Sequence, residues 1–257
     1  CDQVLDALGT PVQERYDLLK SHHATAEKRY YPLAQEVITG TYVGDYDYVL
    51  DLLDRCYFPT REGVANFHDN FVDALILAGE EKIAEGKVEQ AVTLYKKAFT
   101  YPENHQVFLV DERATHDAQI NYCLGEAYAA LGQDAEAEKY WKLAAEQDYE
   151  LKGSKDFRYW TGLALERLGR KAEAEAIFSA LVADGEAAVV TQHVNFYGAE
   201  GTTGVTVDII NSAAYYTQAL GHLGLGHRGK AKRLFAEVQR LKPDHLWANE
   251  FMKQFEK

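Results

Sequence analysis

The amino-acid sequence predicts an all-α protein folded as a right-handed α-α superhelix, that is, a solenoid of helix pairs. Two observations predict this class. A helix-turn-helix pattern recurs along the 257 residues, and apolar residues keep helical spacing while strict two-residue alternation is almost absent. Alanine is abundant and only 5 residues are proline, so little interrupts the helices. These features disfavour sandwiches and barrels, whose strands need alternating apolar residues.

The chain carries 27 Lys and Arg against 40 Asp and Glu, a formal net charge of −13. This balance argues against nucleic acid or an anionic membrane as the main partner. It suits a basic or neutral partner, although a solvated surface accounts for it equally well. Hydrophobic residues make up 47% of the chain, which is enough for a buried core. No apolar run approaches the roughly 18 to 20 residues of a transmembrane segment.

The repeat is clearest between residues 124–132 and 161–169, which share a pattern of leucine, alanine and glycine at an offset of 37 residues. The match continues at the same offset from Trp141 to Phe178. Further copies surround three other turn glycines. The five predicted turn glycines are Gly44, Gly86, Gly132, Gly169 and Gly226.

Each copy predicts two antiparallel helices joined by a short turn. The glycine takes the left-handed conformation that ends the first helix. A small residue five positions later lets the two helices approach closely, and an aromatic residue four positions further fills the gap between successive pairs. A proline then stops the second helix in the copies that close at Pro59, Pro102 and Pro243.

This pattern resembles the tetratricopeptide repeat, which pairs two helices in each unit. The best copy consists of Leu124, Gly125, Tyr128, Ala137, Trp141 and Ala144. Successive turn glycines lie 42, 46, 37 and 57 residues apart, whereas that repeat has a period of about 34 residues. The chain is therefore a variant of the repeat, with extra residues housed between units.

We expect a single helical-repeat solenoid over residues 1–257. Its predicted parts are an N-terminal helical cap at 1–29, repeats at 30–183, an insertion at 184–210, and the last repeat with a C-terminal helix at 211–257. Insertions in solenoids often collect on the binding face, but they also occur wherever extra length is tolerated. Both interpretations of the insertion stay open.

Several strings together resemble the C-terminal helical region of a family of long bacterial proteins of unknown function. The strings are Phe58-Pro59-Thr60-Arg61-Glu62-Gly63, Tyr101-Pro102-Glu103-Asn104, Tyr122-Cys123-Leu124-Gly125-Glu126-Ala127-Tyr128 and Leu220-Gly221-His222-Leu223-Gly224-Leu225-Gly226. In that family the repeats follow a large β-rich N-terminal domain that is suspected to handle carbohydrate. The resemblance implies that this chain is the C-terminal portion of a longer protein, and it supplies no catalytic residues. The chain departs from the family's pattern at Tyr197-Gly198-Ala199-Glu200.

Cys1 admits two interpretations. A lipidated cysteine begins processed bacterial lipoproteins, usually ahead of a flexible polar tether, whereas here Val4, Leu5 and Leu8 already keep helical spacing. That spacing favours the start of a fragment, and we favour a cytoplasmic location over a lipoprotein anchored through Cys1. The 3 cysteines include no Cys-x-x-Cys pair, so neither a disulfide framework nor a zinc knuckle is predicted.

The sequence contains no strong catalytic motif. Gly224-x-Gly226-x-x-Gly229 has the letters of a dinucleotide fingerprint, but that fingerprint lies between a strand and a helix, whereas Gly226 is a turn glycine of the repeat. The 9 histidines form no compact ligand set, since the adjacent His22 and His23 would point in different directions on a helix. We expect no enzyme activity, no cofactor and no metal ion.

A binding groove is better supported. The residue three positions before the glycine position of the Leu-Gly pattern is expected to face a concave groove, and there the three best copies carry Tyr122, Tyr159 and Tyr216. Aligned tyrosines can stack on sugar rings or grip an extended peptide. Helical spacing places Gln119, Glu126, Asp156 and Arg167 on the same side. The alternative is that the tyrosines are ordinary solenoid core, as aromatic stripes at helical spacing more often are.

The predicted function is a non-catalytic protein-interaction or scaffold module that binds a partner segment or an attached domain through this groove. The expected partner is a protein or peptide segment, or the protein's own N-terminal domain. A competing hypothesis makes the chain the accessory region of a bacterial carbohydrate-processing or carbohydrate-binding protein. Carbohydrate is then the partner, and the chemistry lies in an N-terminal domain.

Overall fold

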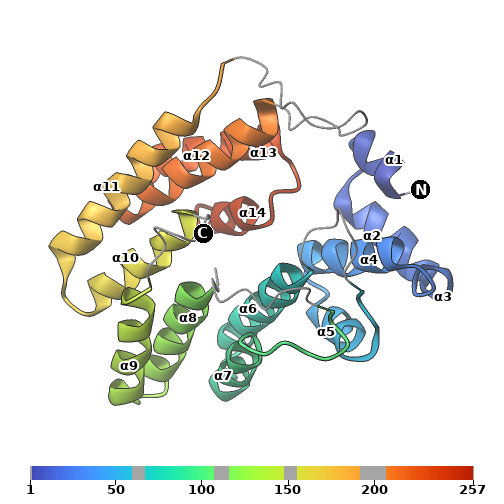
Figure 1. The fold of residues 1–257 in the computed structure, drawn as a ribbon, viewed down its shortest axis with the longest axis horizontal. Helices are drawn as coiled ribbons and strands as arrows, with labels where there is room; N and C mark the ends of the chain where they lie inside the picture. The colour runs from blue at the N-terminus through green and yellow to red at the C-terminus, as the bar shows by residue number, and fades with distance from the viewer. Residues whose placement is uncertain (1, 60–66, 107–115, 148–154, 192–206, 257) are drawn as a thin grey trace. The chain divides into compact units, whose positions relative to one another are not determined.

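The computed structural model describes residues 2–59, 67–106, 116–147, 155–191 and 207–256, which form helices joined by short connections (Figure 1). Over these ranges no β-strand is present, and one isolated bridge joins Phe58 to His105. The all-α prediction is therefore confirmed. The chain forms two compact units, Cys1–Tyr140 and Trp141–Lys257, and the division falls inside one helix.

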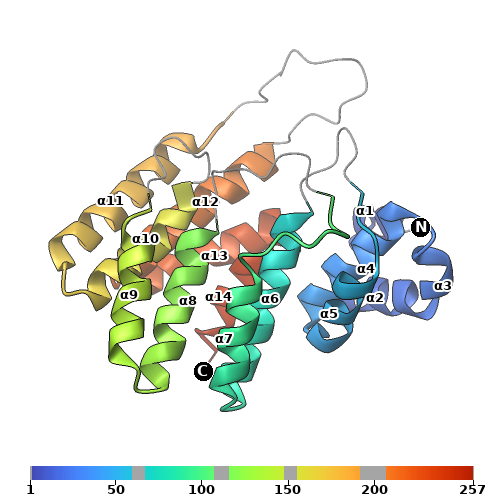
Figure 2. The same ribbon diagram turned by 60° about the horizontal axis from the view of Figure 1, so that its bottom comes forward.

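The first unit contains three short helices followed by three helical hairpins. Its helices are α1 (Asp2–Ala7), α2 (Val12–Ser21), α3 (His23–Ala26), α4 (Tyr30–Val43), α5 (Tyr46–Arg55), α6 (His68–Ala84), α7 (Val88–Lys97), α8 (Asp117–Ala130) and most of α9 (Asp134–Ala145). The hairpins pair α4 with α5, α6 with α7, and α8 with α9 (Figure 2). They form around the predicted turn glycines Gly44, Gly86 and Gly132.

The second unit contains two hairpins and a final helix. Its elements are the end of α9, the 3-10 helix η1 (Lys155–Phe157), α10 (Arg158–Arg167), α11 (Lys171–Ala188), α12 (Val207–Gly224), α13 (Arg228–Leu241) and α14 (Leu246–Lys253). The hairpins pair α10 with α11 and α12 with α13. The predicted insertion at 184–210 begins within α11 and ends within α12, while residues 192–206, including Tyr197, lie outside the described residues. The predicted segment boundaries stay predictions.

All five predicted turn glycines have the left-handed backbone conformation. The φ angles are 82° at Gly44, 75° at Gly86, 69° at Gly132, 75° at Gly169 and 74° at Gly226. At the Gly132 turn, the N–H of Gln133 donates to the carbonyl of Tyr128 at 2.9 Å and the N–H of Gly132 donates to Ala129 at 3.0 Å. The same two bonds recur at the other four turns, so each first helix ends in a Schellman motif that satisfies its last carbonyls.

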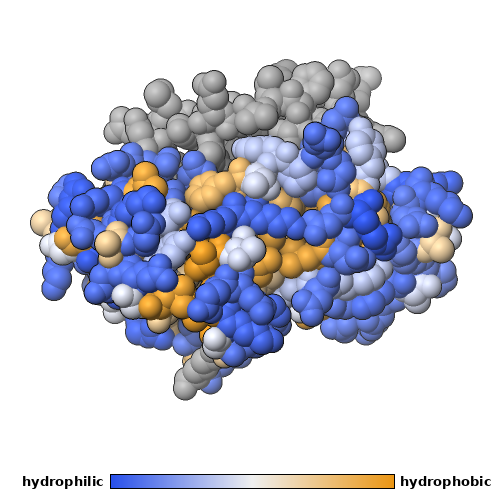
Figure 3. All heavy atoms as spheres, turned by 90° about the horizontal axis from the view of Figure 1, so that it is seen from below, coloured by the Kyte–Doolittle hydropathy of each residue, from blue (hydrophilic) through white to orange (hydrophobic). Residues whose placement is uncertain are grey.

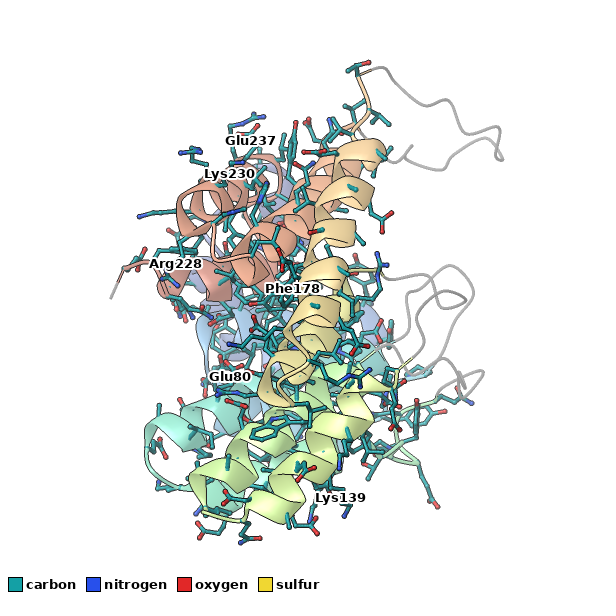
Figure 4. All side chains as sticks on the ribbon, turned by 90° about the vertical axis from the view of Figure 1, so that its left-hand side faces the viewer. Glu80, Lys139, Phe178, Arg228, Lys230 and Glu237 are labelled. Carbon is teal, nitrogen blue, oxygen red and sulfur yellow. The ribbon has the colours of Figure 1, made fainter. Side chains whose placement is uncertain are left out.

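The small and aromatic positions of the repeat form the interior of each unit. The small residues that follow the turns are at most 1% exposed, namely Val49, Ala91, Ala137, Ala174 and Ala231. The aromatic rings of Tyr95 and Phe178 are also buried. Phe178 lies on α11 among the packed side chains of its unit (Figure 4).

Glycines on the first helices make room for these rings. A Cβ added at Gly79 would lie 2.2 Å from the Tyr95 ring, and one added at Gly162 would lie 2.4 Å from the Phe178 ring. Both distances are far below van der Waals contact. The ring of each second helix therefore rests on the bare backbone of its partner helix.

Two of the proline-containing strings lie against each other in the first unit. The N–H of Phe58 donates to the carbonyl of Asn104 at 2.8 Å, and the N–H of Gln106 donates to the carbonyl of Phe58 at 2.9 Å. The Asn104 side-chain nitrogen donates to the carbonyls of Leu53 at 2.8 Å and Cys56 at 2.7 Å. The string after α7 thus satisfies the last carbonyls of α5, a connection between residues far apart in the sequence.

Hydrophilic residues make up most of the face of the described residues that Figure 3 presents. Among the helices described, none is both long enough and apolar enough to cross a bilayer.

Candidate binding site

An open cleft of about 630 Å³ lies in the first unit, between the segment that joins α3 to α4 and the segment that follows α5. Ligand pockets typically have volumes of about 300 to 1,000 Å³. The lining residues are Glu27, Lys28, Arg29, Tyr30, Leu33, Arg55, Cys56, Tyr57 and Pro59. Leu33 and Cys56 are buried, whereas Tyr57 is 56% exposed. The cleft therefore combines apolar surface, an exposed aromatic ring and charged groups.

Two helix ends frame the cleft. α4 begins after Arg29, whose backbone is extended, and it carries Pro32 in its first turn, where the backbone N–H groups have no helical acceptor in any case. α5 ends at Arg55, and the extended backbone of Cys56 directs the chain away from the helix. The lining side chains therefore come from two short segments whose courses are fixed by helix boundaries.

A buried hydrogen-bond network joins α3, α4 and α5 beside the cleft. Glu36 is 0% exposed, accepts a hydrogen bond from the Tyr48 hydroxyl at 2.7 Å, and has its second oxygen 3.0 Å from His23 Nδ1. The other ring nitrogen, His23 Nε2, lies 3.2 Å from Glu27 Oε2. Burial, reinforced by the bond to Glu36, raises the pKa of Tyr48, so its hydroxyl stays a donor at neutral pH.

Arg55 connects this network to the cleft. Its Nη2 donates to His23 Nε2 at 3.0 Å, its Nε donates to Asp51 at 2.8 Å, and its Nη1 lies 3.7 Å from Glu27 Oε2. The side chain is nevertheless 43% exposed. A guanidinium held in place before a ligand arrives loses less conformational entropy on binding.

A cysteine lines the cleft, but its thiol is not activated. Burial raises the pKa of the Cys56 thiol, so at neutral pH it is protonated and is not an activated nucleophile. Over the described ranges, no group of three or more His, Cys, Asp or Glu side chains is arranged to hold a metal ion.

Two of the three predicted groove tyrosines lie in the core of the second unit. Tyr159 on α10 is 5% exposed, and Tyr216 on α12 is 8% exposed. Both rings pack against Phe251, with ring centroids 5.7 Å and 6.4 Å away, respectively. Their surroundings match the alternative that the tyrosine stripe is solenoid core.

The other predicted site residues occupy different settings. In the second unit, Arg167 is exposed with its guanidinium 5.9 Å from the half-buried ring of Trp141, and Asp156 is half-buried in η1. The remaining three share one face of α8 in the first unit.

On α8, Tyr122 and Glu126 are half-buried and Gln119 is 1% exposed. Within the described ranges the side-chain nitrogen of Gln119 has no hydrogen-bond partner. The structure therefore brings together Gln119, Tyr122 and Glu126 on one helix, and Tyr159 with Tyr216 in one core. The site assignment itself stays a prediction.

Sequence reasoning missed the cleft because most of its residues, Pro59 and Cys56 apart, lie outside the repeat positions. The signal that could have found it is the string Lys28-Arg29-Tyr30-Tyr31, an adjacent cation pair and tyrosine pair in a chain with a net charge of −13. This string lies at the boundary between the predicted cap and the first predicted repeat. No short sequence motif predicts the hydrogen bonds that join His23 to Glu36 and to Arg55.

No family model matches the chain, and no curated protein matches it. Among solved structures, the chain is similar to YrrB, described as a TPR protein with an unusual peptide-binding site. The identity is 16% and the TM-score is 0.33, over 91% of this chain and 97% of that chain. The helical-hairpin class of this chain rests on its own helices and turns.

Proposed function

We propose that this chain is a non-catalytic protein-interaction module and that the cleft beside Arg55 holds a segment of a partner protein. The observation that carries the proposal is the cleft itself, beside which half-buried His23, bonded to buried Glu36, holds Arg55 in position. Preorganised polar groups beside apolar surface are what a binding pocket requires. The protonated Cys56 thiol provides no nucleophile for a reaction there.

Two finer alternatives concern the same surface. The β-rich N-terminal domain implied by the family resemblance would supply the bound segment from the same polypeptide. Carbohydrate is favoured by the exposed ring of Tyr57, on which a sugar ring can stack. The predicted groove offers another location, through Tyr122 on α8.

A thermal-shift screen tests the proposal, because a ligand that binds only the native state raises the melting temperature. The full chain is screened against pooled peptides and, separately, neutral oligosaccharides, with Tyr57→Ala as the cleft variant. Phe99→Ala is the matched control, since Phe99 is an exposed aromatic residue that does not line the cleft. We expect a saturable shift with peptides that Tyr57→Ala reduces and Phe99→Ala leaves unchanged.

The other outcomes are equally informative. A shift with oligosaccharides alone favours the carbohydrate alternative. A peptide shift that Tyr57→Ala retains and Tyr122→Ala abolishes places the ligand in the predicted groove. No shift with any probe contradicts the interaction module.

A further inference from the structure

The charge of the cleft is opposite to the charge of the chain. Lys28, Arg29 and Arg55 line it together with one carboxylate, that of Glu27, although the whole chain has a net charge of −13. At physiological ionic strength, charges separated by more than about 8 Å are largely screened. A bound segment therefore responds to Lys28 and Arg29 more than to acidic residues elsewhere on the chain, while the charge of Arg55 is partly offset by Asp51 and Glu27.

Two of the three cations, Lys28 and Arg29, form no ion pair with another described residue. Lys28 and Arg29 are exposed, and within the described ranges neither makes an ion pair or a side-chain hydrogen bond. By comparison, half-buried Lys97 of this unit lies 2.5 Å from Asp54, and exposed Lys87 lies 2.8 Å from Glu85. An unneutralised pair at the edge of a cleft is available to an anionic ligand.

Arg55 adds a cation whose position is fixed. Its bonds to His23 and Asp51 hold the guanidinium while leaving 43% of the side chain exposed. Planar guanidinium groups match the geometry of carboxylates.

The apolar surface of the cleft restricts the class of anion. Buried Leu33 and Cys56, together with the exposed ring of Tyr57, can contact apolar or aromatic side chains of a bound segment. In such a segment these side chains would alternate with its charged ones. A nucleic acid would need a longer row of cations to offset the repulsion from an acidic chain. A short acidic segment with interspersed apolar residues satisfies both surfaces.

We propose that the cleft binds an acidic peptide segment of a partner protein, with its carboxylates at Lys28, Arg29 and Arg55 and an apolar side chain against Tyr57. This inference rests on the proposed function, and it names the chemistry of the segment.

A random dodecapeptide library selected on the full chain tests the proposal. The selected pool is then counter-selected on the Lys28→Ala/Arg29→Ala variant. The matched control is Lys232→Ala/Arg233→Ala, an adjacent and exposed Lys-Arg pair on α13 that changes the net charge by the same amount. Because all four side chains are exposed, both variants should keep the melting temperature of the parent chain.

We expect the peptides lost on the cleft variant to be enriched in Asp and Glu. The affinity of the most enriched peptide should fall roughly two- to thirtyfold on the cleft variant, since that variant removes two exposed ion pairs. Its affinity should not change on the control variant. Replacing its Asp and Glu by Asn and Gln should weaken binding to the parent chain by a similar factor.

The two proposals fail in different ways. Enriched peptides that are lost on the cleft variant but carry no excess of Asp and Glu would overturn the acidic segment while leaving the interaction module in place. If no selected peptide is lost on the cleft variant, the acidic segment is overturned; if Tyr57→Ala also weakens none of the selected peptides, both proposals fail for this site. Displacement of the selected peptide by a uronic-acid oligosaccharide that binds more tightly would make the occupant an anionic carbohydrate and overturn the peptide.

Discussion

Tyrosine occupies three different environments in this chain. Tyr159 is 5% exposed among the aromatic rings of a core, Tyr48 donates a hydrogen bond to the buried carboxylate of Glu36, and Tyr57 is 56% exposed at the cleft. Tyr48 and Tyr159 lie in helices α5 and α10, and Tyr57 follows α5. The residues packed from other helices decide which environment each ring enters, so a tyrosine stripe alone does not identify a binding surface.

The two cysteines of the described ranges provide a prediction at this scale. Cys56 and Cys123 are 9% and 7% exposed, and burial raises the pKa of both thiols. The thiolate is the reactive form, so both should be slow to react. On a Cys1→Ser background, we expect Ellman's reagent at pH 8 to modify neither thiol quickly in the native protein and to modify both in urea. Rapid modification of the native protein would contradict the packing around them.

A glycine and an aromatic ring form a close contact in the α6/α7 and α10/α11 hairpins, between Gly79 and Tyr95 and between Gly162 and Phe178. The Phe178 ring lies against Gly162 on α10 and against Gly224 on α12, where an added Cβ would come within 2.4 Å and 2.3 Å of the ring. Phe178 is itself 1% exposed, so the ring has no free space to move into. One buried side chain therefore determines how closely three helices of the second unit approach.

The prediction for these elements is that Gly162→Ala destabilises the protein by about 1 to 3 kcal/mol, the usual cost of overpacking a filled core. Gly229→Ala in α13 is the matched control, because nothing lies within 4 Å of an added Cβ there. Alanine favours helix, so this control should be neutral or should stabilise by up to about 1 kcal/mol. Urea unfolding of the two variants measures both effects. Equal stability of the two variants would show that the Phe178 contact does not set the spacing.

Buried His68 and half-buried His245 lead us to expect that the stability of both units depends on pH. His68 in the first unit stacks on Tyr101 with ring centroids 4.1 Å apart, and burial lowers the pKa of His68 to about 4. His245 in the second unit packs 4.5 Å from Tyr216, and burial lowers the pKa of His245 to about 4. Burial also lowers the pKa of His105, against the opposing effect of its bond to the Leu53 carbonyl.

The sign of the pH dependence follows from these shifts. An unfolded histidine has a pKa of about 6.5, so between pH 6.5 and 4 the unfolded chain binds more protons than the folded chain. Stability should therefore fall as the pH decreases from about 6.5 to 4, and these residues should have no effect above that range. For His68 the loss amounts to about 2 to 3 kcal/mol at pH 4.5.

Urea unfolding at pH 7 and pH 4.5 checks this prediction with His68→Gln. The stability lost between the two pH values should be smaller in His68→Gln than in the parent chain and should be unchanged in His22→Gln, whose side chain is exposed. His245→Gln provides the same test in the second unit. A pH dependence that none of the substitutions alters would mean that these histidines are not buried in neutral form.

The fold class could be read from the sequence because its signals are local. Each turn glycine acts on the backbone of its own helix end, and all five adopt the predicted conformation. The small and aromatic residues follow each turn glycine at fixed distances in the sequence. Trp141 is half-buried, although it was expected to fill the gap between successive helix pairs. The site was harder to predict, because the helical spacing that aligns Tyr159 and Tyr216 is the same for a groove and for a core.

The sequence by itself therefore determined the helices, the five hairpins and the turns between them, since capping and helical periodicity depend on residues a few positions apart. Only the tertiary structure decided which polar residues meet. His23, Glu36 and Arg55 come together from three helices, and Asn104 reaches the carbonyls of Leu53 and Cys56 across some fifty residues of chain. Such contacts depend on how helices pack, and packing is fixed by the volume and shape of side chains that are far apart in the sequence.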